Sequence, residues 1–417
     1  MTIEKSLQQL LELAYHDFLE LEKSTKQQRN DAILAMAKGL TQAFEQILEA
    51  NTLDLLEAKE MVRPELVINW LKLTPYRLEN AVKIIEAIAK LNDPLDRRIY
   101  RLQQQYNLPQ SYCRATSLGV ILYVSEALPE LGAIAAAMAI KTGNSIILRG
   151  TGESTHTKEA IAKILQSALV KGELPHHCIQ DISPDLGNFM IKDLVTQDKY
   201  IQLIIPYGRP SLVRNVYNLA TIPTLFTVMG NCYLHYCNSG DMDLVQKMII
   251  DSHQSKPDPV NAIEKVTIEE NYKSYGLIKI WKNLKEEGFQ LKGDHELVAE
   301  FPEYLTPVQP EEWGLPYLSK TVAFKLVDNL EQGIEFINQH STGHTNCLVT
   351  DSYEVSRNFG NQIKSAFTYI NCSPRFSRIS QNEEAVYLGI ANQKDGRRGL
   401  ISLESFTTIK QVIEGID

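Results

Sequence analysis

The chain has 417 residues, of which 44% are hydrophobic and 22% charged, and its formal net charge is −9. This length favours two or three structural units, and the composition is typical of a soluble globular protein. The acidic balance argues against a nucleic-acid or membrane surface, because both require basic patches. The six cysteines are widely spaced, which fits reduced thiols, so we expect a cytoplasmic protein.

The first ninety residues are predicted to be helical. Residues 1–21 carry acidic side chains throughout, which is typical of an amphipathic helix and not of a secretory signal. Between residues 30 and 56 apolar residues recur at three- and four-residue steps, which places them on one helix face. Thr74-Pro75 predicts a helix start, because threonine caps well and proline fits the first helical position. Asn92-Asp93-Pro94 predicts the end of that helix.

From Leu118 the pattern changes to short apolar strands that alternate with helices. Such alternation indicates an α/β fold with a parallel sheet of nucleotide-binding type, and a second α/β unit is predicted after Gly230. The segment 97–115 is predicted to be a protruding hairpin. The predicted strands are 119–124, 145–148, 178–182, 201–205 and 222–227, and the predicted helices include 130–141 and 156–170.

The stretch His253–Glu264 contains Pro257 and the run Asn261-Ala262-Ile263-Glu264, and it has no cysteine. It resembles the loop of γ-glutamyl phosphate reductases (glutamate-5-semialdehyde dehydrogenases), where a proline, two residues and a cysteine precede Asn-Ala-x-Glu. Pro257 and the run 261–264 keep that frame, and Val260 occupies the cysteine position. A thiolate attacks an acyl carbon, whereas the isopropyl group of valine has no lone pair to do so.

The resemblance covers nearly the whole chain, which makes it stronger than any one motif. Lys141–Gly150, for example, is similar to the family's KSGNAVILRGG. It implies the aldehyde-dehydrogenase fold: a Rossmann-like cofactor domain, a second α/β catalytic-type domain, and a small arm through which chains form a homo-oligomer. The expected ranges are 1–100 and 117–229 for the cofactor domain, 230–395 for the catalytic-type domain, and 101–116 and 396–417 for the arm.

The resemblance also implies NADPH as cofactor, with contacts from Arg149, Gly150, Glu153, Gly208 and Arg209. The turn at Arg149-Gly150 ends a strand and leads into a helix, where backbone N–H groups suit a phosphate. On local sequence alone it is equally an ordinary strand–helix turn. At Arg209 two interpretations stay open. Its bulk would block a pyrophosphate, or its guanidinium would pair with a 2′-phosphate.

Several other polar positions have two interpretations each. Glu126 is a residual site residue or orients a turn, and His156 is a site residue or caps a helix. Cys232 is a substitute nucleophile or a packed core thiol, of which the second is the commoner fate. His176-His177-Cys178 has no second ligand cluster at zinc spacing, so no metal site is predicted.

The departures from the family pattern concentrate where its reaction takes place. Besides Val260, Leu128 replaces an arginine suited to phosphate or carboxylate. Pro316 and Ser319 replace two carboxylates, one of which resembles the group that holds the nicotinamide ribose in related dehydrogenases. Residues 379–387 replace a glycine-rich run that lines the site. These changes predict a reaction centre that is no longer used for the family's reaction.

In that reaction the cysteine displaces phosphate to give a thioacyl enzyme, and hydride transfer then leads to glutamate 5-semialdehyde in proline biosynthesis. We therefore expect a catalytically degenerate homologue with a binding or regulatory role and with NADPH binding weakened or lost. Its expected partners are an active paralogue or a glutamate kinase. The alternative is an active NADPH-dependent reductase of γ-glutamyl phosphate or another acyl substrate with a non-standard site. A second genomic copy with an intact cysteine would distinguish the two.

Overall fold

The computed structural model describes residues 3–96, 98–100, 110–182, 190–227, 229–255, 257–270, 274–392 and 398–414. Two compact units account for the chain: unit 1 contains Met1–Thr227, Arg378–Gly389 and Leu400–Asp417, and unit 2 contains Val228–Ser377 and Ile390–Gly399. Residues 378–389, which the sequence analysis assigns to the catalytic-type domain, therefore pack within unit 1. Of the expected arm, residues 101–109, 396–397 and 415–417 lie outside the described residues.

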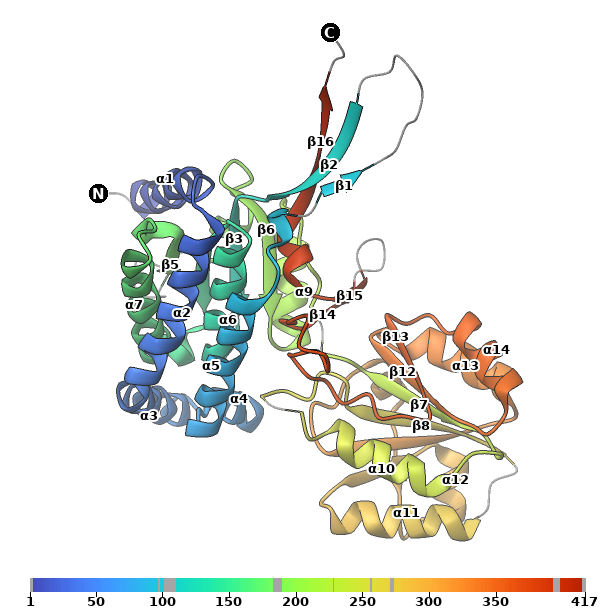
Figure 1. The fold of residues 1–417 in the computed structure, drawn as a ribbon. Helices are drawn as coiled ribbons and strands as arrows, with labels where there is room; N and C mark the ends of the chain where they lie inside the picture. Colours follow the sequence, from blue (N-terminus) through green and yellow to red (C-terminus); the bar gives the residue numbers. More distant parts are fainter. Residues whose placement is uncertain are drawn as a thin grey trace. The chain divides into compact units, whose positions relative to one another are not determined.

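Unit 1 is built on a parallel sheet in the order β5-β4-β3-β6 (Figure 1). All six residues of β3 are buried, as expected for a strand covered on both faces. The predicted strand at 222–227 is wrong, because only one bridge forms there, between Thr224 and Ile204. Its neighbour Pro223 has no N–H with which to extend the ladder. The strands are β3 (Val120–Ser125), β4 (Ser145–Gly150), β5 (Ile179–Ile182) and β6 (Ile201–Tyr207).

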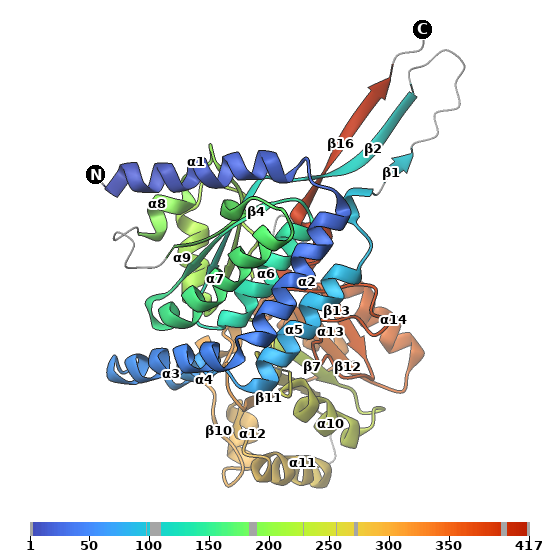
Figure 2. The same cartoon turned by 60° about the vertical axis from the view of Figure 1, so that its left-hand side comes forward.

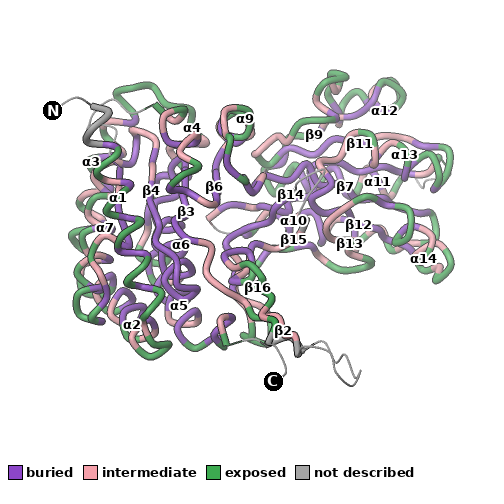
Figure 3. The backbone as a smooth tube through the Cα atoms, turned by 90° about the horizontal axis from the view of Figure 1, so that it is seen from above, coloured by how far each residue is buried: buried purple, intermediate pink, exposed green. Residues whose placement is uncertain are grey.

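Helices cover both faces of this sheet. On one face α1, α8 and α9 share a core cluster with the strands. In addition, α6 packs against β3 and β4, and α7 packs against β5. Every residue of α6 is buried, and Figure 3 shows this helix and its neighbouring strands in the buried colour. The helices are α1 (Ile3–Leu21), α2 (Lys26–Gln42), α3 (Phe44–Glu60), α4 (Glu65–Leu71), α5 (Pro75–Lys90), α6 (Pro129–Lys141), α7 (Thr155–Lys171), α8 (Ile191–Val195) and α9 (Pro210–Leu219), with short 3-10 turns η1 (Pro94–Asp96), η2 (Gly152–Ser154), η3 (His176–Cys178) and η5 (Leu403–Phe406).

The predicted start at Thr74-Pro75 is confirmed. Helix α5 begins at Pro75, and the Thr74 side chain accepts a hydrogen bond from the Arg77 backbone N–H at 3.2 Å. This bond satisfies one of the donors that every helix start leaves unpaired.

A second, antiparallel sheet in unit 1 has the order β1 (Arg98–Tyr100), β2 (Gln110–Ser117), β16 (Thr407–Glu414). The C-terminal strand pairs with β2 over eight residues, from Thr407 opposite Ser117 to Glu414 opposite Gln110. In Figures 1 and 2, β2 and β16 extend away from the helices of unit 1. Pairing of this sheet with a neighbouring chain stays a prediction.

Unit 2 contains a parallel sheet in the order β10-β9-β11-β8-β7-β12-β13. One face packs under α10, α11 and α12 around Trp281, and the other under α13 and α14 around Phe359. Its strands are β7 (Cys232–Tyr236), β8 (Ile263–Glu269), β9 (Gln290–Gly293), β10 (Thr306–Pro307), β11 (Thr321–Val327), β12 (Thr345–Val349) and β13 (Phe367–Ile370), with a separate pair β14 (Ile390–Asn392) and β15 (Arg398–Leu400). Its helices are α10 (Met242–Ser252), α11 (Ser274–Glu286), α12 (His295–Glu300), α13 (Leu330–His340) and α14 (Tyr353–Gln362), with the 3-10 turn η4 (Pro310–Gly314).

The predicted α/β class with parallel sheets is thus confirmed in both units. None of the helices in the described ranges is long and apolar enough to cross a lipid bilayer.

Candidate functional site

The position in unit 2 that the family resemblance assigns to the nucleophile holds a buried hydrocarbon side chain. Val260 precedes β8 and is 3% exposed. Its backbone is tied to neighbouring segments, since the Gly230 N–H donates to the Val260 carbonyl at 3.2 Å. Next to it the Asn261 amide donates to the Pro374 carbonyl at 2.9 Å and accepts from the Thr345 hydroxyl at 3.0 Å. Asn261 therefore anchors the loop, and Val260 offers no group that could react.

Cys232 lies beside this loop but is not poised to replace the missing thiol. A Cβ added to Gly230 would lie 2.6 Å from Cys232 Sγ and 2.7 Å from the Val260 carbonyl oxygen, so sulfur and loop backbone are close neighbours. The side chain is fully buried. This burial, and to a smaller extent the nearby Glu264 carboxylate, raises the pKa of the thiol well above its ordinary value. A protonated thiol is a poor nucleophile. These surroundings favour the packed-core interpretation.

A buried ionic pair that the sequence analysis did not single out fixes the segment 315–319. The Glu264 carboxylate accepts from the backbone N–H groups of Tyr317 at 2.6 Å and Leu318 at 2.8 Å. The Lys265 ammonium lies 3.5 Å from the centre of the Tyr317 ring and 3.8 Å from Glu264. Burial raises the pKa of Glu264 and lowers that of Lys265. A lysine inside a strand pattern gives no local signal of such burial, which explains why the sequence analysis missed it.

In unit 1 the predicted cofactor residues Arg149, Gly150 and Glu153 gather at the carboxyl end of β4 and in η2. Burial lowers the pKa of Arg149, and the Asp181 carboxylate on neighbouring β5 raises it in part. Glu153 is 4% exposed, and the Arg63 guanidinium lies 3.9 Å from it. The structure thus brings these three predicted residues to one end of the sheet, where α/β folds bind nucleotides.

Two further charged residues belong to this cluster. Lys158, on the first turn of α7, packs so closely on Gly150 that a Cβ there would lie 1.6 Å from its Nζ. Among the described residues Nζ has no hydrogen-bond partner, and burial lowers the pKa of Lys158 to about 8. Burial raises the pKa of Asp181 to about 6. The mixture of cations and carboxylates suits both the phosphate and the ribose hydroxyls of a dinucleotide.

At the next strand end Glu126 and Arg209 bind each other. Glu126 Oε2 accepts from the Arg209 backbone N–H at 2.9 Å, and Arg209 Nε lies 3.0 Å from both carboxylate oxygens. Gly208 has φ +155°, and a Cβ on it would lie 2.7 Å from Glu126 Cβ, so only glycine fits the turn. Glu126 thus orients this turn and takes the backbone N–H of Arg209, the residue directly before α9.

The remaining candidates have structural contacts. His156 Nε2 lies 3.0 Å from Glu57, which raises the pKa of the imidazole, and the His156 backbone N–H donates to Asp54 at 2.9 Å. Asp54 therefore caps the start of α7. His177 contacts Asp17 of α1 at 3.1 Å through its ring, so this histidine docks the N-terminal helix.

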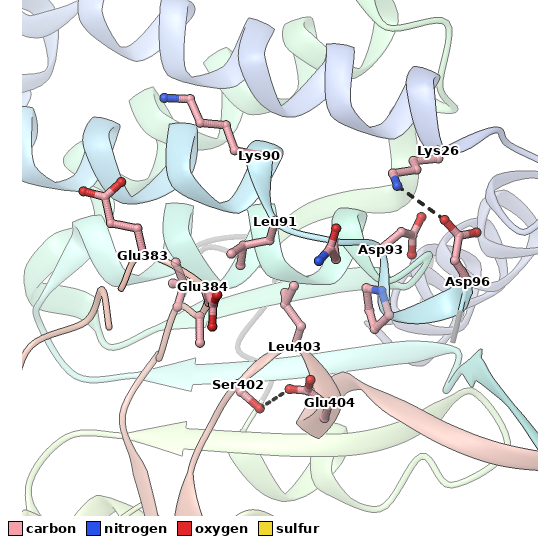
Figure 4. A pocket seen from close by; sticks show the side chains of 14 residues that line it. Lys26, Lys90, Leu91, Asp93, Asp96, Glu383, Glu384, Ser402, Leu403 and Glu404 are labelled. Carbon is pink, nitrogen blue, oxygen red and sulfur yellow. Dashed lines mark hydrogen bonds and ion pairs between the residues drawn. The ribbon is translucent and has the colours of Figure 1, made fainter. Parts of the chain in front are cut away.

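A cavity of about 720 Å³ lies elsewhere in unit 1 (Figure 4). Its walls are the end of α5 with the following turn, and the segments 383–386 and 402–404. In Figure 4 the Lys26 ammonium reaches Asp96, at 3.3 Å, and Ser402 donates to Glu404 at 2.5 Å. Part of the run 379–387, which the sequence analysis places at the reaction centre, therefore lines this cavity of unit 1.

The two parallel sheets, each covered by helices, are those of a protein with the aldehyde-dehydrogenase fold. The solved acetylating aldehyde dehydrogenase of Geobacillus thermoglucosidasius supports this with a TM-score of 0.71 at 16% identity, covering 99% of this chain and 97% of that one. No protein-family profile matches the chain.

The chain belongs to the γ-glutamyl phosphate reductase family. It is 45% identical over 409 residues to γ-glutamyl phosphate reductase 2 of Synechocystis sp., covering 98% of this chain and 97% of the relative. It is 32% identical to the γ-glutamyl phosphate reductase of Gloeobacter violaceus, covering 93% of this chain and 91% of the relative. The solved γ-glutamyl phosphate reductase of Thermotoga maritima matches with a TM-score of 0.86 at 27% identity, covering 98% of both chains.

Proposed function

We propose that this chain is a γ-glutamyl phosphate reductase homologue that has lost the family's covalent reduction and acts as a binding or regulatory protein. The observation that carries the proposal is the buried Val260 side chain at the nucleophile position, in a loop whose frame is otherwise kept. Without a thiolate no thioacyl enzyme forms, and the difficult acyl transfer is not divided into easier steps. The protonated, buried Cys232 thiol offers no substitute.

The cofactor expected for this family is NADPH, which supplies a hydride when bound. Arg149, Gly150, Glu153 and Lys158 suit its adenosine end. The N-terminus of α9 suits NADPH poorly, because the Arg209 backbone N–H and guanidinium already donate to the Glu126 carboxylate. Loss of a charge-assisted hydrogen bond costs about 1.5–3 kcal/mol, or roughly ten- to a hundredfold in affinity. We therefore expect NADPH to bind more weakly than micromolar, as calorimetry on the whole chain would measure.

A binding role needs a partner surface, and the antiparallel sheet of unit 1 offers one. β16 is an edge strand of that sheet, and its residues Ile409 and Ile413 are 63% and 66% exposed. Exposed apolar side chains on an unpaired edge favour association with another chain. We propose a homo-oligomer through this edge, with an active paralogue or a glutamate kinase as further partner. Light scattering that gives a dimer or larger for the wild type, and a smaller species for Ile409→Lys/Ile413→Lys, would support it. A wild-type monomer would contradict it.

Phosphate-dependent NADPH formation from glutamate 5-semialdehyde tests the loss of catalysis. The γ-glutamyl phosphate reductase of Thermotoga maritima serves as the positive control. The wild type and Cys232→Ser should both match the blank without enzyme. Turnover by the wild type that disappears in Cys232→Ser would reject the proposal and identify Cys232 as the nucleophile.

A further inference from the structure

A cluster of possible metal ligands in unit 2 plays no part in the proposed function. His235 lies in β7, Cys237 directly follows that strand, and Glu269 ends the neighbouring strand β8. One ligand atom from each of the three lies within 4.8 Å of those from the other two. A histidine nitrogen, a thiolate and a carboxylate are all ligands that Zn²⁺ accepts.

Strand pairing brings these three side chains to one face of the sheet. In the parallel register His235 lies opposite Thr267 and Tyr236 opposite Ile268, so Cys237 and Glu269 are the next positions along. Side chains two apart on a strand share a face. Tyr233 and Cys237 pack in the core cluster with α13 and α14, whereas Leu234 and Tyr236 pack on the other face. The three candidate ligands therefore project together beneath α13 and α14.

The imidazole of His235 is held in one orientation with one nitrogen committed. Its Nδ1 lies 2.9 Å from the Thr267 hydroxyl, and its ring stacks on Phe359 with centroids 6.3 Å apart and planes at 18°. A Cβ on Gly333 of α13 would lie 2.5 Å from the ring, so the glycine makes room for it. In metal-binding histidines, the ring nitrogen that does not bind the metal typically has a hydrogen-bond partner that fixes the ring.

The other nitrogen faces the remaining ligands. His235 is fully buried, and its Nε2 makes no hydrogen bond among the described residues. It lies 3.5 Å from Glu269 Oε1, too far for a good hydrogen bond. Two ligands bound at about 2.0–2.2 Å to one tetrahedral metal lie roughly 3.4 Å apart. The second oxygen of Glu269 accepts from the Asn238 N–H at 3.1 Å, which leaves Oε1 directed at the histidine.

We propose that His235 Nε2, Cys237 Sγ and Glu269 Oε1 bind one Zn²⁺ ion, with Thr267 as the residue that positions the imidazole. On binding, the sulfur–hydrogen bond of Cys237 breaks, its proton passes to solvent, and a zinc–sulfur bond forms. The Glu269 side chain is 18% exposed, so water can supply a fourth ligand from that side. The zinc would join the ends of β7 and β8.

The test uses the purified whole chain, stripped with a chelator and titrated with Co²⁺ as a spectroscopic substitute for Zn²⁺. The wild type should take up one equivalent and show the absorption of tetrahedral cobalt with a sulfur-to-metal charge-transfer band. Zn²⁺ should displace the cobalt and raise the melting temperature. Removing a ligand should weaken binding by more than the roughly ten- to a hundredfold typical of positioning residues. The ligand variants are His235→Gln, Cys237→Ser and Glu269→Gln.

Controls separate a metal site from mere packing. Thr267→Val should weaken Co²⁺ binding by about ten- to a hundredfold and leave the charge-transfer band in place. Cys232→Ala, which removes the buried thiol at the start of β7, should leave binding unchanged. Glu269→Gln, at the partly exposed edge, keeps the test decisive if His235→Gln or Cys237→Ser fails to fold. Lack of a charge-transfer band in the wild type, or a band that persists in Cys237→Ser, would overturn the proposal and leave only a packing contact between His235 and Glu269.

Discussion

Glu126 Oε2 accepts a hydrogen bond from the Arg209 backbone N–H at 2.9 Å, while the Arg209 guanidinium binds the same carboxylate. An internal carboxylate thus lies at the N-terminus of α9, where negative charge is favoured. This contact unites two residues that the sequence analysis treats separately, one as a residual site residue and one as a cofactor contact.

Glu126→Gln should strengthen NADPH binding. Removing the charge frees the Arg209 guanidinium and the helix N-terminus for phosphate, so we expect about a three- to thirtyfold lower Kd by calorimetry. Asp243→Asn makes the same charge change in an exposed pair with Lys279 in unit 2 and should leave the Kd unchanged. Unchanged or weaker binding by folded Glu126→Gln would contradict this account.

Lys158→Met should stabilise the protein at neutral pH. The pKa of Lys158 is about 8 in the folded chain against an ordinary 10.5, so the unfolded chain binds more protons between these values. The contribution of Lys158 to stability therefore rises with pH across that window. At pH values below the window the buried ammonium lowers the free energy of unfolding. The free energy of unfolding at pH 7 should increase by about 1–3 kcal/mol. The gain should vanish as the pH passes 10.5.

The quantity to compare is the difference in free energy of unfolding between variant and wild type at each pH. The wild-type profile alone is not enough, because burial lowers the pKa of Lys141 as well. The charged groups that act on Lys158 are Asp181, Glu153 and Asp54, which favour its charge, together with Arg149, which opposes it. Lys163→Met, on an exposed part of the same helix, is the matched control and should show no pH-dependent gain. A destabilised Lys158→Met, or a difference from the wild type that does not change between pH 8 and 10.5, would contradict this account.

Arg77→Met should destabilise unit 1 strongly. Arg77 Nε donates to Glu130 Oε1 at 2.6 Å, and Arg77 Nη2 donates to the Trp70 carbonyl at 2.9 Å. All three residues are buried. Breaking a buried pair leaves an uncompensated charge and costs about 3–5 kcal/mol. Hydrogen exchange in α5 and α6 should accelerate accordingly, and the double variant Arg77→Met/Glu130→Gln should recover part of the loss. Equal hydrogen-exchange rates in Arg77→Met and the wild type would show that this buried pair does not stabilise unit 1.

Gly172→Ala tests the close approach of α7 to α2. A Cβ at Gly172 would lie 2.8 Å from the Cα and 2.9 Å from the N of Ala32, and backbone cannot move aside cheaply. Such overpacking costs about 1–3 kcal/mol, which denaturant unfolding would measure. At Gly152 an added Cβ meets nothing within 4 Å, so Gly152→Ala should change stability by less than about 0.5 kcal/mol. A similar small change in both variants would mean that the helices separate readily.

Local sequence patterns predicted most helices and strands of unit 1. They did not predict which side chains are buried by contacts between segments that are distant in sequence. The helix predicted at 130–141 is α6 at 129–141, because its start and its apolar run are local features. The strand predicted at 222–227 fails, because Pro223 cannot extend the ladder. The burial of Lys158 and Lys265 follows from packing between distant segments, and the approach of His235 to Glu269 follows from the pairing of β7 with β8. None of these leaves a periodic signal in sequence.

Restoring the thiol alone should not restore the enzyme. Leu128, Pro316 and Ser319 would still hold substrate and cofactor poorly, and a misplacement of about 1 Å can cost a hundredfold in rate. Val260→Cys should therefore remain far below the Thermotoga maritima protein in NADPH formation. A Val260→Cys rate close to that control would show that the thiol is the one missing part.

The wild-type rate of phosphate-dependent NADPH formation from glutamate 5-semialdehyde is the most direct test of the central claim. Loss of a catalytic nucleophile lowers rates by up to about 10⁶. We predict a wild-type rate equal to the blank without enzyme, beside an active Thermotoga maritima control in the same buffer. Sustained wild-type turnover above the blank, proportional to protein concentration, would contradict the loss of the family's reaction.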